Sequence, residues 1–157
     1  MSSAGELRRI WSKRMRRGPM DPRDAASLAP GGLEGDANFG RRFRQVTLIQ
    51  EELWREVEAE LGAALDPALR RANLLVAGVE LANSRGKVLQ IGPCRLRIQG
   101  ETRPCNLMDE QYPGLQAALR APWRGGAFAE VLHAGVVRPG DPVSWCEEGA
   151  EEAQAEA

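Results

Sequence analysis

The residue best suited to metal or sulfur chemistry in this chain is Cys105, which closes the segment QGETRPC at 99–105. A predicted strand ends near Gly100, and the proline stiffens the loop that follows. The guanidinium of Arg103 favours a thiolate over a thiol at Cys105, and a thiolate is the better nucleophile and the better ligand for a soft metal. By composition alone, however, a single loop cysteine has no assigned role.

Other familiar catalytic arrangements are missing from the sequence. The chain has one histidine, His133, which lies in a strand-like run. It has no G-x-S-x-G or H-E-x-x-H segment, and no G-x-G-x-x-G follows a predicted strand. A zinc site would need more nitrogen and sulfur ligands than the chain clusters. Acid–base chemistry by loop carboxylates stays open, although nothing singles out a pair among Asp36, Asp109 and Asp141.

The three cysteines predict free thiols. Cys94, Cys105 and Cys146 cannot form an even disulfide framework, and they contain no C-x-x-C pair. No apolar run approaches the roughly 20 residues that cross a bilayer, and the N-terminus lacks the apolar segment of an export signal. We therefore expect a cytoplasmic protein with no membrane partner, whose thiols stay reduced and available as ligands.

The charge is balanced overall but unevenly distributed. A length of 157 residues with 43% hydrophobic content fits one domain with a core, and the net charge of −1 makes nucleic acid an unlikely partner. The N-terminal 23 residues are nevertheless strongly basic, which suits either a phosphate-bearing ligand or a solvated first strand and turn. The acidic stretch 148–157 has little to bury, so we predict a disordered tail after a single domain over 1–147.

Turn-forming residues recur at short intervals, which is typical of a β-rich domain. Between them, short apolar or alternating runs predict strands. In the clearest, Cys94, Leu96 and Ile98 alternate with polar residues. The predicted strands cover 73–79, 87–91, 94–99, 127–133, 136–137 and 143–145.

Helices interrupt these strands. Between about residues 50 and 61, Leu53, Val57 and Leu61 recur every four positions, which predicts an amphipathic helix. A shorter helix is predicted over 113–120, beginning at a proline. Many strands with two or three short helices favour a mainly β fold, a barrel whose helices cover its openings.

An ordered set of short matches resembles the MOSC domains, the C-terminal domains of molybdenum cofactor sulfurases, in their stand-alone bacterial form. Each match is weak alone, but together they span roughly residues 30–145 in the expected order. The matching segments are GLEGD at 32–36, RQVTLI at 44–49, RANL at 71–74, GVEL at 78–81, PC at 104–105, GVV at 135–137 and GD at 140–141.

The resemblance implies a MOSC-type β-barrel that binds the molybdenum cofactor (molybdopterin), with Cys105 as the catalytic residue and metal ligand. The R-x-N element of the family falls on Arg71 and Asn73, where a guanidinium can bind phosphate or pterin oxygens and an amide can both donate and accept. Without the motif, these two residues would equally fit a plain connection between a helix and a strand. Further candidates for cofactor binding are Arg103, Asp36 and Arg44.

The chain departs from the family pattern at one position and lacks accessory modules. Some members carry a histidine two places after the Gly-Asp pair, where this chain has Asn38, so no role of that histidine carries over. No flavin or iron–sulfur module is present, so a reductase would take electrons from a separate protein. The first hypothesis is a reductase of small N-hydroxylated or N-oxide compounds.

Two alternatives stay open. A cofactor or sulfur carrier would hold a persulfide on Cys105 without turnover. A more distant possibility is a barrel that binds RNA or another protein through its basic arm.

Overall fold

The computed structural model describes residues 5–146, so the predicted tail lies outside the described part of the chain. Strands dominate, as predicted. The strands are β1 (Gly5–Lys13), β2 (Met20–Arg23), β3 (Ala26–Ala29), β4 (Gly32–Leu33), β5 (Val46–Gln50), β6 (Leu74–Ala77), β7 (Val88–Ile91), β8 (Cys94–Glu101), β9 (Ala127–His133), β10 (Gly135–Val137) and β11 (Pro142–Trp145). The helices are α1 (Glu51–Leu61), the short 3-10 helix η1 (Pro67–Arg70), α2 (Leu107–Gln111) and α3 (Leu115–Ala118).

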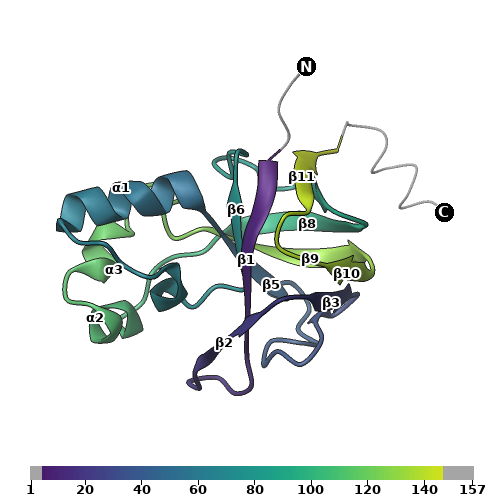
Figure 1. The fold of residues 1–157 in the computed structure, drawn as a ribbon, viewed down its shortest axis with the longest axis horizontal. Coiled ribbons are helices and arrows are strands. Elements are labelled where there is room, and N and C mark those ends of the chain that lie inside the picture. Colours follow the sequence, from purple (N-terminus) through teal and green to yellow (C-terminus); the bar gives the residue numbers. More distant parts are fainter. Residues whose placement is uncertain (1–4, 147–157) are drawn as a thin grey trace.

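Seven strands close into a barrel. Their order is β11-β7-β8-β9-β5-β6-β1, and β1 pairs again with β11, opposing Gly5 to Val143 (Figure 1). β2 extends the edge at β1, and β10, β3 and β4 form a small separate sheet. The predicted barrel is therefore confirmed. Closure pairs the edges that an open sheet would leave exposed.

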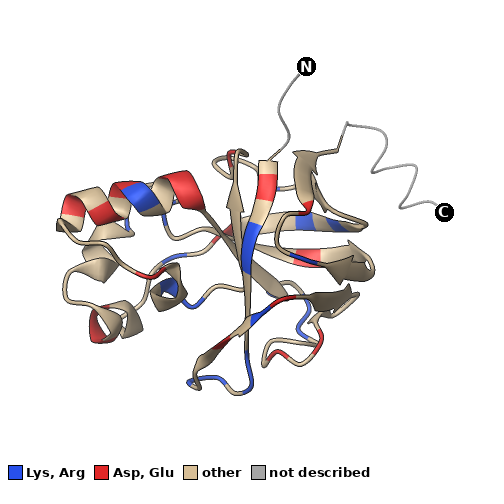
Figure 2. Cartoon of the chain, in the orientation of Figure 1, with Lys and Arg blue, Asp and Glu red and all other residues tan. Residues whose placement is uncertain are grey.

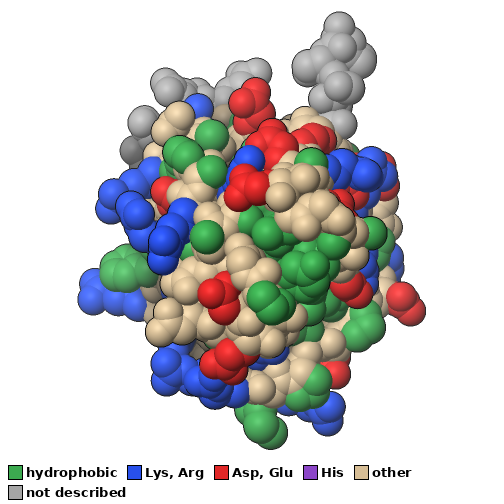
Figure 3. Space-filling model, turned by 90° about the vertical axis from the view of Figure 1, so that its left-hand side faces the viewer, with side chains coloured by type: hydrophobic (Ala, Val, Ile, Leu, Met, Phe, Trp, Pro, Cys, Tyr) green, Lys and Arg blue, Asp and Glu red, His purple; other side chains and the backbone are tan. Residues whose placement is uncertain are grey.

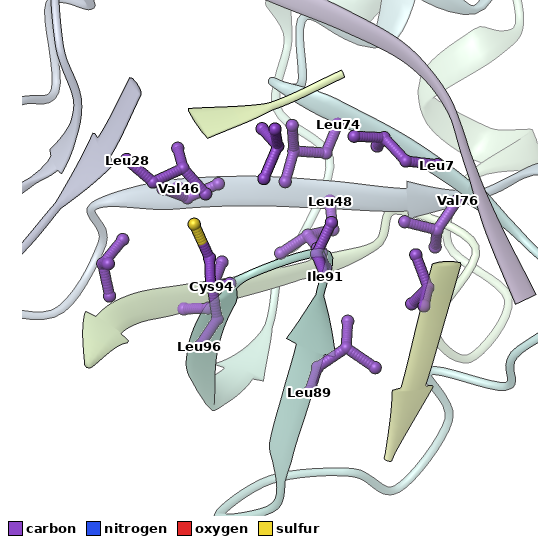
Figure 4. Close-up of a cluster of buried hydrophobic side chains, with 14 of the residues drawn as sticks. Leu7, Leu28, Val46, Leu48, Leu74, Val76, Leu89, Ile91, Cys94 and Leu96 are labelled. Atoms are coloured by element: carbon purple, nitrogen blue, oxygen red, sulfur yellow. The ribbon is translucent and has the colours of Figure 1, made fainter. Parts of the chain in front are cut away.

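The interior of the barrel is filled by one face of each strand. In β8 the side chains of Cys94, Leu96 and Ile98 are fully buried, while the intervening polar residues are half-buried, as the alternation predicted. The sulfur of Cys94 points into the same cluster as Leu28 and Val46 (Figure 4). A second cluster of buried residues fills the space between the barrel and the helices.

The helices gather on one side of the barrel (Figure 1). On this end of the molecule, hydrophobic side chains form a central patch with basic side chains along one margin (Figure 3). The α1 prediction was right in extent and in the burial of Val57, and Leu61 packs against the same cluster. Leu53, however, is only half-buried, and Trp54 is buried beside Val57. The indole of Trp54 donates to the carbonyl of Leu65 at 2.9 Å, a tertiary contact that periodicity does not reveal.

The second predicted helix is shorter than the sequence indicated. α3 spans four residues and begins at Leu115, two positions after the predicted proline, because Gly114 precedes it with a φ of 90°. Its two leucines, Leu115 and Leu119, are buried as predicted. α2 was not predicted, and it begins two residues after Cys105. None of the helices in residues 5–146 is long and apolar enough to cross a membrane.

Candidate functional site

A small cationic cavity lies where the barrel meets the helices. Its volume is about 40 Å³, which is room for a few water molecules or one oxyanion group. Four basic side chains line it, and none of its lining residues is acidic. The lining residues are Lys13, Asn38, Arg44, Thr47, Arg70, Arg71, Ala72, Thr102 and Gly125.

Segments far apart in the sequence supply the four cations. Lys13 is the last residue of β1, beside the basic loop that joins β1 to β2 (Figure 2). Arg44 precedes β5, and Arg70 ends η1. Arg71 follows in the left-handed conformation, with a φ of 66°, which turns the chain toward β6. We therefore name Lys13, Arg44, Arg70 and Arg71 the cationic cluster.

Arg70 is the most buried member of the cationic cluster, 7% exposed, and Lys13 is also buried. Its Nε donates to the carbonyl of Gly125 at 2.9 Å, and one Nη donates to the hydroxyl of Thr102 at 3.0 Å. Its other Nη lies 3.7 Å from the sulfur of Met108. All of these partners are neutral, so burial, with a smaller effect from the nearby charge of Arg44, lowers the pKa of Arg70. A buried cation without a counterion favours an anionic ligand.

The other three members of the cationic cluster also lack a carboxylate partner at ion-pair distance among the described residues. Burial lowers the pKa of Lys13, and the charge of Asp36 opposes that effect. The pKa of Arg44 is lowered by partial burial and by neighbouring Arg41. Arg71 donates to the carbonyl of Gly18 at 2.7 Å, which anchors it to the basic loop.

Cys105 lies beside this cluster and is exposed. It occupies the loop between β8 and α2, and its carbonyl accepts a hydrogen bond from the amide of Met108 at 3.0 Å. A negative charge on its sulfur would partly oppose the lowering of the pKa of Arg44, Arg70 and Arg71. The structure thus brings Cys105, Arg71 and Arg44 together, three of the residues singled out by the sequence.

Asp36 and Asn73 occupy the framework behind the cavity. Asn73 is fully buried: its amide donates to Trp11 O and to Asp36 Oδ1, both at 3.1 Å, and its Oδ1 accepts from the Thr47 amide at 3.0 Å. Asp36 also accepts from the backbone amide of Lys13 at 2.8 Å. The two residues therefore connect β1, β5 and the segment before β6, and direct contact of either with a cofactor stays a prediction.

Arg103 lines a different, larger hollow of about 320 Å³ on the outer side of β8 and β9. Consecutive side chains of an extended segment point to opposite sides. Thr102 consequently faces the cationic cavity, while Glu101 and Arg103 face the larger one. A contact between Arg103 and a cofactor in the cationic cavity also stays a prediction.

The sequence analysis missed Arg70 and Thr102 and counted Lys13 only as part of a basic arm. The residues of that basic arm have different surroundings: Lys13 lines the cavity, whereas Arg9, Arg14 and Arg17 each form an ion pair with a carboxylate. The one available signal for Arg70 was its position next to the R-x-N element. Its burial depends on Gly125 and Thr102, which are more than 30 residues away in sequence.

The donor set of the site suits an anionic cofactor with a soft metal. Residues 5–146 contain no group of three or more histidine, cysteine or carboxylate side chains that could enclose a metal ion. One exposed sulfur beside four cations could instead supply a single ligand to a metal that arrives on an anionic organic group. These residues therefore suit an anionic ligand that carries its own metal.

Comparison with known proteins settles the family. The family model described as the MOSC domain matches residues 35–144. The chain belongs to the MOSC family. Among the curated proteins, none matches the chain.

Three solved structures of small bacterial MOSC proteins resemble the chain. The YuaD protein from Bacillus subtilis is 20% identical, with a TM-score of 0.79, and the match covers 89% of this chain and 94% of that one. YiiM from Geobacillus stearothermophilus is 16% identical, with a TM-score of 0.73 and coverages of 92% and 76%. YiiM from Escherichia coli is 18% identical, with a TM-score of 0.69 and coverages of 97% and 77%. At these identities the likeness supports the fold alone.

Proposed function

We propose that this MOSC protein binds the molybdenum cofactor, with Cys105 as its protein ligand to molybdenum. The observation that carries the proposal is the exposed sulfur of Cys105 beside three arginines that have no carboxylate partner within the described residues. An unpaired cationic cluster suits the phosphate of the cofactor, and a thiolate suits molybdenum.

Each residue of the site would have a distinct part. Arg70, fixed by Gly125 and Thr102, provides a rigid positive charge at the base of the cavity. Arg71 and Arg44 flank it with guanidinium groups that can donate two hydrogen bonds to one oxyanion. Lys13, a buried residue, adds a further positive charge. Together these residues would hold the anionic part of the cofactor, and Cys105 would supply a thiolate ligand to its metal.

The finer proposal is a reductase of small N-hydroxylated or N-oxide compounds. When bound, the cofactor supplies two-electron redox chemistry that can remove oxygen from a substrate. The electrons would come from a separate protein. Exposure of Cys105 supports this proposal, because the reacting centre must be open to the substrate.

The test is the molybdenum and pterin content of the full chain, purified from a host that makes the cofactor. Wild type should contain molybdenum, and Cys105→Ser should lose most of it. The matched control is Cys146→Ser, which removes a half-buried thiol elsewhere and should leave the content unchanged. A wild-type protein without molybdenum or pterin, in a host that loads other molybdenum enzymes, would contradict the proposal. Reduction of benzamidoxime with a supplied electron donor then tests the reductase activity.

The exposure of the same sulfur also favours a second function, a sulfur carrier with a persulfide on Cys105. An exposed thiolate is open to a sulfur donor and to an acceptor protein. A carrier would show a mass increase of one sulfur atom at Cys105 and no turnover of benzamidoxime. A reductase would show turnover that is lost together with molybdenum in Cys105→Ser.

A further inference from the structure

The larger hollow beside the cationic cavity has a chemistry of its own. Aromatic rings of Trp123 and Phe128 form part of its wall, and the guanidinium groups of Arg85 and Arg103 lie at the same hollow. Its volume of about 320 Å³ is within the range of pockets that hold small organic molecules. Neither the family match nor the proposed cofactor site accounts for these side chains.

The aromatic wall is built by specific contacts. Phe128 on β9 opposes Gly100 on β8, and a side-chain carbon at Gly100 would come within 3.1 Å of the ring. The absence of a side chain at Gly100 therefore lets the ring lie against the strand. The guanidinium of Arg44 lies 5.7 Å from the centre of the same ring. Phe128 thus stands between the cationic cluster and the larger hollow.

Trp123 is held in place by the strand opposite. Its backbone has a φ of 62°, a left-handed conformation that is uncommon for a bulky residue. The carboxylate of Glu101 accepts a hydrogen bond from the amide of Trp123 at 2.7 Å. Strained residues that surrounding contacts hold in place are concentrated at ligand sites. The hydrogen bond also gives Glu101 a structural partner at the wall of the hollow.

The charged side chains that line the hollow indicate which kind of ligand it would bind. Arg85 and Arg103 are exposed, and neither has an ion-pair partner among the described residues. With Glu101 they leave one net positive charge, which favours an anion of charge −1. Aromatic faces favour a flat ligand, because rings stack on rings and arginines stack on both.

We propose that this hollow binds a planar aromatic monoanion, such as an aromatic carboxylate, separately from the cofactor. The proposal assigns Arg103 to this ligand in place of the cofactor role expected from the sequence. It does not depend on the proposed function, because it rests on the side chains of this hollow alone. Thr102 and Arg44 line the cationic cavity and not this hollow, so the two ligands would occupy separate hollows.

The test is calorimetric titration of the full chain with 2-naphthoate. Two matched ligands isolate the two features: 2-naphthamide keeps the ring without the charge, and decahydronaphthalene-2-carboxylate keeps the charge without the flat ring. We expect 2-naphthoate to bind at least tenfold more tightly than either. Equal affinity for all three ligands, or no binding of 2-naphthoate, would overturn the proposal.

Variants locate the site. Arg103→Ala and Arg85→Ala should each weaken 2-naphthoate binding at least fivefold, and Phe128→Leu, which keeps an apolar side chain, should weaken it as well. Arg55→Ala, which removes an exposed arginine on α1, should leave binding unchanged. Binding that is lost in Arg71→Ala but kept in Arg103→Ala would place the ligand in the cationic cavity and overturn the proposal.

Molybdenum content, measured on the same preparations, separates this inference from the proposed function. Binding that depends on Arg103 in protein without molybdenum supports the inference while the proposed function fails. Normal molybdenum content in a protein that does not bind 2-naphthoate overturns the inference and leaves the proposed function standing. Because Arg85 and Arg103 are exposed, their substitution should leave the protein folded. Melting temperatures of the variants measure this.

Discussion

Two cysteines of this chain illustrate how position decides the chemistry of a side chain. Cys94 is fully buried in the barrel, where burial and the nearby charge of Asp141 raise its pKa to about 11. Cys105 is exposed in a loop beside the cationic cluster. The reactive form of cysteine is the thiolate, so only an exposed, ionisable sulfur can react at neutral pH.

We therefore expect iodoacetamide at pH 8 to modify Cys105 in the native protein and to spare Cys94. At that pH the Cys94 thiol lies below its raised pKa, stays protonated and is screened from the reagent. Peptide mass spectrometry after brief labelling measures the modification of both cysteines. Labelling in urea measures the same two cysteines in the unfolded chain, for comparison. Comparable labelling of Cys94 and Cys105 under native conditions would show that the barrel interior is open.

At the scale of elements, Asn73 joins three separate segments through its buried side chain. Asn73→Ala should lower the free energy of unfolding by about 3 kcal/mol, since it leaves several buried groups without partners at roughly 1–3 kcal/mol each. Asn73→Asp should cost more, because it places a second carboxylate against Asp36. Urea unfolding measures both. Asn106→Ala, an exposed asparagine without a capping hydrogen bond, should change little.

Two glycines allow the effect of backbone strain to be distinguished from that of a steric clash. Gly126 and Gly40 have similar positive φ values, 98° and 95°. A side-chain carbon at Gly126 would collide with the carbonyl oxygen of Leu48, whereas Gly40 has open space around it. Gly40→Ala should therefore cost about 1 kcal/mol of strain, while Gly126→Ala should prevent correct folding. Soluble yield and thermal unfolding measure the difference, and equal behaviour of the two variants would contradict the described loop.

At the scale of the whole molecule, a net charge of −1 conceals a local cluster of cations. We expect sulfate, which is a dianion throughout the range, to bind at pH 7 and to raise the melting temperature. Binding should weaken as the pH rises toward 10. Lys13, whose pKa is lowered, loses its proton at a lower pH than an ordinary lysine. Arg70 keeps its charge over this range, because a guanidinium stays protonated in proteins, so the change is carried by Lys13.

The stability of the ligand-free protein should depend on pH in the opposite direction. A lysine with a lowered pKa is more easily protonated in the unfolded chain, so its burial costs less as the pH rises through that pKa. Titration of sulfate at pH 7, 8.5 and 10, with Arg55→Ala as the control, measures the effect. Unchanged affinity over this range, or the same affinity in Arg71→Ala, would contradict a sulfate site at the cationic cluster.

The sequence predicted what depends on local periodicity. The alternation from Cys94 to Ile98 predicted both the strand and its buried face. The barrel was predicted from the many short strands with few helices, and also from the family resemblance. The sequence pattern placed Leu53 on the buried face of α1, where the structure instead buries Trp54, whose indole donates to the carbonyl of Leu65. It overlooked Arg70, whose partners are distant in sequence. The sequence alone does not distinguish an arginine that faces water from one that donates to a buried carbonyl.

The pairing of Gly5 with Val143 has a practical consequence for electrochemistry. Lys13 lies at the far end of β1, about 26 Å away at roughly 3.3 Å per residue. A linker fused near either of these paired residues would tether the molecule by the end remote from its cations. On a gold electrode, such a tether would leave the sulfur of Cys105 facing the solution, where soluble mediators and reducible compounds can reach it by diffusion.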